Sequence, residues 1–492
     1  MRLRVWSAAT LLLAARAPLS AAGRAAAVAG GFYPADRAEL ARTVDAALAA
    51  ASAPSGLEGP VIAMLVPHAG YDFSASVAAQ GYKAAADAYD TVVVLGTAHH
   101  VAVAGAALDS EDPFETPLGP VPLDLKLIKL LLEDPLFKDM PEAHAAEHSI
   151  EVQLPFLQRR LKPGFRLVPI VMNVEDEDVA RRVGMAVARA LKGRKALLVL
   201  SSDLSHYPPA ETARKVDAAT LLALESMDPD RFWQAERLML ARGEKNLVCA
   251  YCGESAVLAG LVAARALGAD RATLLRYANS ASTPHGDPER VVGYAAMAFT
   301  RAGKPAAAPP PLTPDQRTAL LSRARRAVAE ALDGRKAGLE LADDPALDQP
   351  AAVFVTLTKG GALRGCVGTT QPRLPLFDAV ADSALSAAFS DRRFTPVAKE
   401  ELTGLRFEIS ILSASRRVAG AEEVTVVRDG VVVEQGGRTG LFLPQVWEQI
   451  PRKEDFLAEL CSEKAGLPRD CWRDPATEIR VFTVEAFTEP GK

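Results

Sequence analysis

Three groups of histidines each follow a run of apolar residues of strand length. His68 comes after the first run, His99 and His100 after the second, and His206 shortly after the third. Ligands collect beyond the carboxyl ends of the strands in an open α/β sheet. Imidazole is also the commonest metal ligand and the side chain that titrates near neutral pH. The spacing therefore predicts a metal site or an acid/base site at one edge of a sheet.

Cys252 is a further candidate ligand, because it stands directly before a predicted helix over Gly253–Leu267. A helix N-terminus lowers the pKa of a thiol and favours the thiolate that binds metals. Two other interpretations stay open, namely a buried structural cysteine and a redox disulfide between Cys249 and Cys252. A zinc finger is excluded, because it needs a second ligand pair at a fixed spacing.

Carboxylates beside histidines are candidates for proton transfer. Asp203 and His206 can form a carboxylate–imidazole pair, which fixes the tautomer of the histidine and raises its basicity. Asp203 can equally cap the loop that follows its strand. His148, between Glu147 and Glu151, is either an acid/base group or a residue at a helix start. The remaining histidines are expected at the surface or in loops: His144 and His285.

The elements that must carry these residues alternate between helix and strand over residues 28–301. Such alternation is typical of βαβ units, so we expect an α/β fold with a central, mainly parallel sheet flanked by helices. A strand is predicted over residues 165–171. Helices are predicted over residues 38–50, 76–88, 124–132, 178–191, 210–225 and 254–267.

Residues 302–312 are rich in proline and alanine, which predicts a stiff, exposed linker between two independent domains. Residues 313–492 contain no histidine, and we expect an α+β fold there. Its first helix should begin after Thr313, a good N-cap, with Pro314 in the first helical position. β-hairpins are predicted around two short polar segments: residues 359–361 and 428–430.

Composition and charge exclude several classes of protein. The formal net charge is −5, without the basic stripe or domain that marks a nucleic-acid-binding protein. Five cysteines are too few for a disulfide scaffold, although Cys461 and Cys471 can pair in an oxidising compartment.

The N-terminal residues 1–27 have the charged start, short apolar core and small-residue exit of a secretory signal. This pattern predicts export to the periplasm or another extracytoplasmic compartment. The alternative is a cytoplasmic protein with a mis-assigned start. The apolar core is too short for a stable membrane span, and no other segment resembles a transmembrane helix.

Five motifs in a fixed order resemble those of the Memo family, over roughly residues 30–300. They are Pro67–Tyr71, His99–His100, Glu147–Glu151, Ser201–His206 and Cys252–Gly253. The resemblance implies a fold similar to the class III extradiol dioxygenases of the LigB type, which hold non-haem Fe(II) by two histidines and a carboxylate. It assigns the metal ligands to His68, His99 and Cys252, and further pocket positions to His206 and His148.

Cys252 departs from the dioxygenase pattern, because it stands where those enzymes carry a glutamate. Two histidines and a carboxylate suit Fe(II), whereas a thiolate admits copper or zinc as rivals. We expect Fe(II) first, with copper or zinc as alternatives. His100 and Tyr71 are candidates for substrate binding. His100 is also a rival ligand, since only the resemblance favours His99.

Residues 315–488 resemble the AMMECR family through the motif Leu363–Gly368, supported by residues 387–394 and 405–410. In prokaryotes the two domains commonly accompany a radical-SAM protein, in the AmmeMemoRadiSam grouping, so the resemblance implies such a partner. Arg364 is a candidate for binding an anionic ligand. Cys366 lies between two glycines, which either permit close approach to a ligand or shape a tight turn.

These features together predict metal-dependent redox chemistry, with non-haem iron or copper, on an unknown small molecule or peptide. His206, His148 and Asp203 are the predicted acid/base groups. The rival from another class is a non-catalytic module that binds a peptide or small ligand in the same pocket. A serine hydrolase is disfavoured, because the residues around Ser201 lack the GxSxG elbow.

Overall fold

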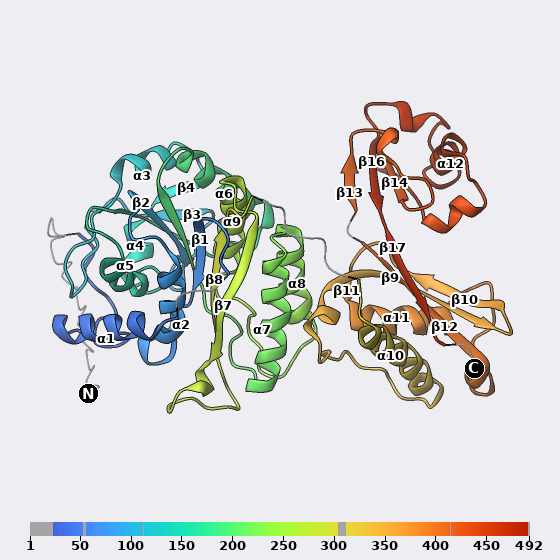
Figure 1. The fold of residues 1–492 in the computed structure, drawn as a ribbon, viewed down its shortest axis with the longest axis horizontal. Helices are drawn as coiled ribbons and strands as arrows, with labels where there is room; N and C mark the ends of the chain where they lie inside the picture. Colours follow the sequence, from blue (N-terminus) through green and yellow to red (C-terminus); the bar gives the residue numbers. More distant parts are fainter. Residues whose placement is uncertain (1–22, 53–55, 112, 304–310, 414, 491–492) are drawn as a thin grey trace, which may run out of the picture.

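The computed structural model of the 492-residue chain describes residues 23–52, 56–111, 113–303, 311–413 and 415–490. Most of the predicted signal, residues 1–22, and most of the predicted linker, residues 304–310, lie outside the described residues. Figure 1 shows a larger N-terminal part, in blue to green, beside a C-terminal part in yellow to red. No helix among the described residues combines the length and apolar character of a membrane span.

The N-terminal part is built on one sheet, whose described strands run in the order β4-β3-β5-β2-β6-β1-β8-β7. Its centre, from β5 to β1, is parallel, while β8 and β7 add an antiparallel edge. The strands are β1 (Val61–Val66), β2 (Thr91–Thr97), β3 (Ala106–Leu108), β4 (Phe137–Asp139), β5 (Arg166–Met172), β6 (Ala196–Ser201), β7 (Arg271–Asn279) and β8 (Gly293–Thr300). The predicted α/β fold with a mainly parallel sheet is confirmed.

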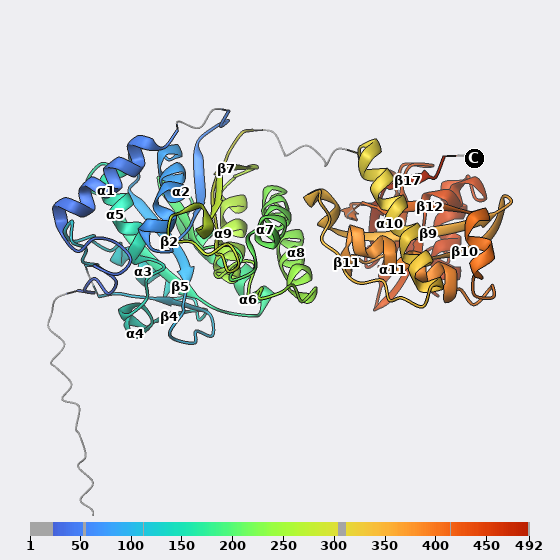
Figure 2. The ribbon, with the colours of Figure 1, turned by 90° about the horizontal axis from the view of Figure 1, so that it is seen from below.

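Helices cover both faces of this sheet, which explains why its central strands consist mainly of apolar residues. β2, for example, is buried at every residue, as expected for a parallel strand between two helical layers. One group of helices contains α1, α2 and α5, and another contains α6 and α9 (Figure 2). The helices are α1 (Arg37–Ala50), α2 (Tyr71–Ala84), α3 (Leu125–Leu131), α4 (Pro141–Ala145), α5 (Leu154–Arg160), α6 (Glu177–Leu191), α7 (Ala210–Glu225), α8 (Pro229–Ala241) and α9 (Glu254–Ala266).

Two helices of this part differ from the sequence expectation. Helix α2 begins at Tyr71 rather than at Ser76, directly after Gly70, so its first turn adjoins the histidine of the preceding loop. Helix α8 was not among the predicted helices. Asp228 caps it by accepting hydrogen bonds from two backbone N–H groups, and Pro229 occupies its first turn.

The C-terminal part is α+β, as predicted, and carries two antiparallel sheets with the strand orders β10-β9-β12-β17 and β13-β16-β14-β15, while β11 pairs with β9. Helices α10 and α11 pack on the first sheet and α12 on the second. The strands are β9 (Pro350–Lys359), β10 (Ala362–Gly368), β11 (Leu374–Pro375), β12 (Leu405–Leu412), β13 (Arg416–Val418), β14 (Gly430–Gln435), β15 (Arg438–Phe442), β16 (Glu478–Phe482) and β17 (Val484–Thr488). The helices are α10 (Pro314–Leu332), α11 (Leu376–Phe389) and α12 (Lys453–Glu459).

Local signals in this part were correct in two cases and wrong in one. Thr313 forms a capping box with Gln316 at the start of α10, and β9 and β10 form the predicted hairpin. The second hairpin is not centred on residues 428–430. β14 pairs instead with β15 across Gly436 and Gly437, whose positive φ angles of 56° and 78° suit a tight turn.

The two parts meet through buried polar contacts of α7 and α8. Arg242, at the end of α8, forms ion pairs with Asp348 at 2.6 Å and with Asp378 at 2.7 Å, and its side chain is 1% exposed. Gln349 donates to the backbone carbonyl of Ala219 in α7. The exposed spacer that the sequence predicts is thus accompanied by direct packing between the parts.

Candidate metal centre

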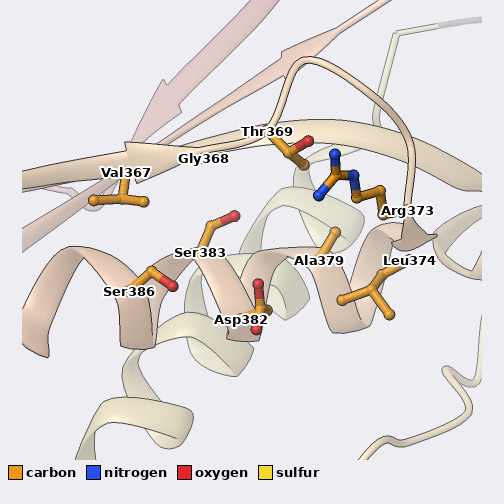
Figure 3. A pocket seen from close by; sticks show the side chains of 9 residues that line it. All are labelled: Val367, Gly368, Thr369, Arg373, Leu374, Ala379, Asp382, Ser383 and Ser386. Atoms are coloured by element: carbon orange, nitrogen blue, oxygen red, sulfur yellow. The ribbon is translucent and has the colours of Figure 1, made fainter. Parts of the chain in front are cut away.

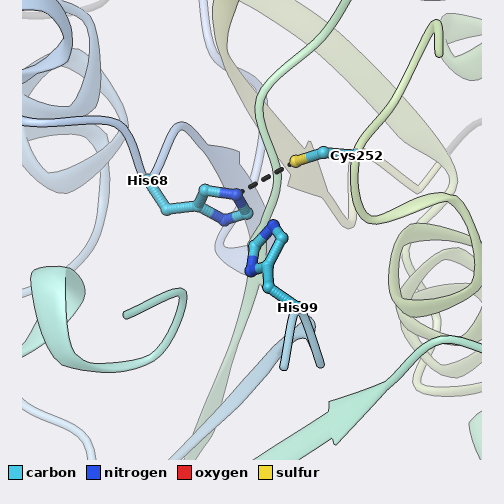
Figure 4. Close-up of side chains that lie close together, drawn as sticks. All are labelled: His68, His99 and Cys252. Carbon is cyan, nitrogen blue, oxygen red and sulfur yellow. Dashed lines mark hydrogen bonds between the residues drawn. The ribbon is translucent and has the colours of Figure 1, made fainter. Parts of the chain in front are cut away.

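The sheet brings the predicted ligands to one edge. Strands β2, β6 and β1 are neighbours and parallel, so their carboxyl ends lie together. His68 follows β1, and His99 follows β2. Cys252 comes from the loop before α9, which packs on β6 and β2. Figure 4 shows the three side chains pointing toward one another.

The three donors are close enough to share one ion. Nitrogen atoms of His68 and His99 and the Sγ of Cys252 all lie within 4.8 Å of one another. The Nε2 of His68 lies 3.0 Å from Cys252 Sγ, and the two imidazole rings meet edge to face with centroids 5.3 Å apart. His68 is buried, whereas the side chain of His99 is 28% exposed. The cluster therefore has a closed side and a side open toward solvent.

A buried serine hydroxyl contacts the ring nitrogen of His68 that faces away from Cys252. The Nδ1 of His68 lies 3.1 Å from the Oγ of Ser201. Ser201 donates to the carbonyl of Ser149 at 2.5 Å and accepts from Nε2 of Gln153 at 2.9 Å. Burial, followed by the neighbouring His148 and His99, holds the pKa of His68 well below its ordinary value. His68 is therefore a neutral imidazole near pH 7.

A buried carboxylate supports His99 in the same way. Glu147 accepts from the Nδ1 of His99 at 2.9 Å and from its backbone N–H at 2.7 Å. It also accepts from the backbone N–H groups of His148 and Ser149, each at 2.8 Å. Burial alone would raise the pKa of Glu147, but the hydrogen bond and charge of His99 hold it well below its ordinary value. No sequence feature assigned Glu147 a role of its own, and its signals were its place beside His148 and in the motif Glu147–Glu151.

His148 lies against both candidate histidine ligands. Its ring stacks on His99 with centroids 4.5 Å apart and meets His68 edge to face at 5.3 Å. Burial, followed by the charge of His99, lowers the pKa of His148 to about 4. Nitrogen atoms of His99 and His148 also form a second potential donor group with a Glu147 oxygen. His148 is thus a neutral imidazole near pH 7 that packs beside the three-donor cluster.

Cys252 differs from the expectation that its helix N-terminus would favour a thiolate. Burial, followed by the charge of Asp203, raises its pKa well above the ordinary thiol value. Cys249 and Cys252 are both free, so the redox disulfide between them is not formed. Gly253 is required beside Cys252, because a Cβ there would lie 2.8 Å from Thr97 Oγ1.

Asp203 and His206 do not form the direct ion pair that the sequence suggested. Asp203 accepts instead from the backbone N–H groups of His68 and Ala69, at 2.8 and 3.2 Å. The Nδ1 of His206 donates to the carbonyl of Leu204 at 2.9 Å. Asp203 therefore fixes the loop that carries His68. Burial raises the pKa of Asp203, and the charge of His206 lowers it, so the two side chains still influence one another.

Other predicted residues lie outside the three-donor cluster. His100 is exposed, with its ring centroid 6.4 Å from that of His99. The Tyr71 hydroxyl is buried and donates to the carbonyl of Val152, so it packs the core instead of facing a substrate. His285 is exposed as expected. His144 is not a surface residue: it is 1% exposed and bonds to the Ala107 carbonyl.

The candidates in the C-terminal part are also engaged in structural contacts. Both the Nε and Nη2 atoms of Arg364 bond to Glu401, and Nη1 bonds to the Thr395 carbonyl, which leaves little capacity for an anionic ligand. The backbone N–H of Cys366 is bound by Asp391. A Cβ on Gly365 would lie 2.1 Å from the Ala387 carbonyl. This glycine thus permits the close approach of α11 to β10.

A hollow of about 200 Å³ lies between the end of β10 and α11 in this part. Figure 3 shows Asp382, Ser383 and Ser386 along α11, with Arg373 on the loop opposite. The described residues that line this hollow do not include Arg364 or Cys366. The hollow is therefore separate from the residues that the sequence singled out.

Comparisons with known proteins match two segments of the chain to two different families. A family model described as Memo-like protein matches residues 24–298, and one described as AMMECR1 matches residues 321–487. A MEMO1 family protein of Aquifex aeolicus is 38% identical over 276 residues, which cover 56% of this chain and 98% of the relative. One from Methanococcoides burtonii is 39% identical over 276 residues, covering 55% and 97%. An uncharacterized protein from Pyrococcus horikoshii, whose structure is solved, is 40% identical in sequence to the aligned region. The alignment covers 35% of this chain and 89% of that protein, with a TM-score of 0.32.

Proposed function

Because the chain belongs to the Memo-like family, we propose that His68, His99 and Cys252 hold one divalent metal ion that serves redox chemistry. The observation that carries this proposal is the convergence of two imidazole nitrogens and one sulfur within 4.8 Å. Bonds of about 2.1 Å to nitrogen and about 2.3 Å to sulfur separate neighbouring donors by roughly 3.1–3.6 Å. The 3.0 Å between His68 Nε2 and Cys252 Sγ needs only a small opening to match this spacing.

Fe(II) is the proposed ion, with copper or zinc as the competitors. Two imidazoles with one further anionic ligand leave open positions of the kind that non-haem iron uses, while the softer thiolate favours copper or zinc more than a carboxylate would. When bound, such an ion supplies Lewis acidity and electron transfer to a substrate or to O2. The open side beside His99 is the proposed entry for a small molecule or peptide.

Proton transfer at this centre is assigned to His148 and His206. His148 stacks on His99 and is neutral near pH 7, so it can accept a proton from a substrate held on the open side. His206 donates through Nδ1 to a carbonyl, which leaves its Nε2 lone pair free to act as a base. Asp203 positions His68 by binding its backbone N–H.

Two features outside the centre support further parts of the proposal. The Cys461–Cys471 disulfide supports the location of the protein in an oxidising compartment, because disulfides persist mainly in such compartments. The AMMECR1 domain supports association with a radical-SAM protein, through the family grouping in which both domains occur.

The proposal is tested by metal analysis of the full chain after anaerobic purification. We expect one Fe per chain after loading with Fe(II), and strong loss in His68→Ala, His99→Ala and Cys252→Ala. His285→Ala is the matched control, since His285 is exposed and outside the cluster. Equal metal content in the wild type and the triple variant would refute the site. Bound metal without any metal-dependent turnover or O2 uptake would favour the non-catalytic binding module.

A further inference from the structure

The hydrogen bonds around Ser201 decide which nitrogen of His68 carries its proton. A serine hydroxyl has one hydrogen and two lone pairs. The hydrogen of Ser201 goes to the Ser149 carbonyl, which can only accept, at 2.5 Å. One lone pair accepts from Gln153, whose amide is oriented by a second bond, from Nε2 to the Pro67 carbonyl. The other lone pair is left for His68 Nδ1 at 3.1 Å, and Nδ1 must therefore donate.

Glu147 decides the same question for His99. An ionised carboxylate only accepts hydrogen bonds. The side chain of Glu147 is 1% exposed and is surrounded by N–H donors. An unprotonated Nδ1 on His99 would place a lone pair 2.9 Å from a carboxylate oxygen in a buried site. The Nδ1 of His99 therefore carries the proton, and its Nε2 does not.

We propose that Ser201 and Glu147 are positioning residues that lock His68 and His99 in the Nδ1–H tautomer, so that both Nε2 lone pairs face the proposed ion. This inference rests on the proposed function for its purpose, but the tautomers themselves belong to the metal-free protein. In that state the Cys252 thiol donates its hydrogen to His68 Nε2 across 3.0 Å. Cys252 and His68 would hold a divalent ion through sulfur and Nε2 only after this hydrogen has left as a proton.

The test reads the tautomers directly in the metal-free full chain. With ¹⁵N-labelled histidine, a long-range ¹H–¹⁵N spectrum distinguishes a protonated ring nitrogen from an unprotonated one. At a pH well above the ordinary histidine pKa of about 6.5, we expect His68 and His99 each to show a protonated Nδ1 and an unprotonated Nε2. His68→Ala and His99→Ala assign the signals. A protonated Nε2 on either histidine in the wild type overturns the proposal for that residue.

Two variants separate positioning from general structural support. Ser201→Ala should change the ring signals of His68 and leave those of His99, whereas Glu147→Gln should do the reverse. Each should weaken Fe(II) binding by about 10–100-fold, the usual effect of removing a partner of a metal-binding histidine. Loss of binding with unchanged tautomers would show a merely structural role. If the wild type has the expected tautomers but binds no Fe(II), the proposed function fails while the tautomer assignment stands.

Discussion

The guanidinium of Arg242, at the end of α8, lies 2.6 Å from the carboxylate of Asp348 in the C-terminal part, and both side chains are buried. A second carboxylate, Asp378, lies 2.7 Å from the same arginine. Burial raises the pKa of Asp348 to about 6, although the charge of Arg242 opposes this. The two parts of the chain are thus joined by a buried arginine from one part and two buried aspartates from the other, of which Asp378 also lies 3.6 Å from Arg323 in its own part.

Arg242→Ala should destabilise the full chain substantially. Removing one partner of a buried ion pair leaves the other charge uncompensated, which typically costs about 3–5 kcal/mol. The free energy of unfolding, measured by urea denaturation, checks this. Lys215→Ala is the matched control, because Lys215 also pairs across the two parts but its partner Asp343 is exposed. We expect little change there. Equal stability of the two variants would show that the buried pair contributes nothing.

Cutting the chain within residues 304–310 should have different effects on the two pieces. Residues 28–301 contain His68, His99 and Cys252, so this piece should keep Fe(II) binding. Residues 313–492 lose Arg242, which pairs with Asp348 and is one of two arginines beside Asp378, so this piece should melt at a lower temperature than the same part of the full chain. Melting curves and metal content of each piece check both statements. Metal binding that returns only when the pieces are mixed would mean that the centre spans both parts.

Fe(II) affinity should rise with pH across the neutral range. Burial raises the pKa of Cys252 well above the ordinary thiol value, so below that pKa the ion must displace a proton to bind sulfur. His68 is already neutral at pH 7, because its pKa lies well below the ordinary value, and it releases no proton. One displaced proton predicts an increase of about tenfold per pH unit. Anaerobic competition titrations at several values from about pH 6.5 to about pH 8.5 measure the slope of Fe(II) affinity against pH. An affinity that does not change with pH contradicts the assignment of the Cys252 thiol as a ligand.

His206→Ala should leave Fe(II) content nearly unchanged and reduce metal-dependent turnover by about 10²–10⁴-fold, the usual contribution of a general acid or base. His206 is outside the three-donor cluster and bonds through Nδ1 to a backbone carbonyl. Metal content and turnover are measured on the same preparation. Loss of the metal would make His206 a ligand. His144 is unsuitable as a control, since it is buried and bonded to the Ala107 carbonyl.

The sequence alone was informative wherever local pattern and chain order are sufficient. Apolar runs of strand length alternating with helices determine a parallel sheet, and parallel neighbours bring their carboxyl ends to one edge. His68 and His99 stand directly after two such runs, so their proximity follows from topology. Thr313 and Pro314 mark a helix start through contacts within one turn, which explains why that boundary was correct.

Tertiary structure decided the partner of each polar side chain. The sequence names the residue types at Asp203, Tyr71, Arg364 and His144, but it does not say which groups these side chains contact. Only the fold binds Asp203 to the His68 backbone, Tyr71 to Val152 and Arg364 to Glu401. It also places Glu147 behind His99 and Arg242 between two aspartates. The periodicity of apolar residues indicates which face of a helix or strand is buried. Hydrogen bonds between residues far apart in sequence require the atoms to be positioned to within a few tenths of an ångström, and this positioning arises only when the elements pack.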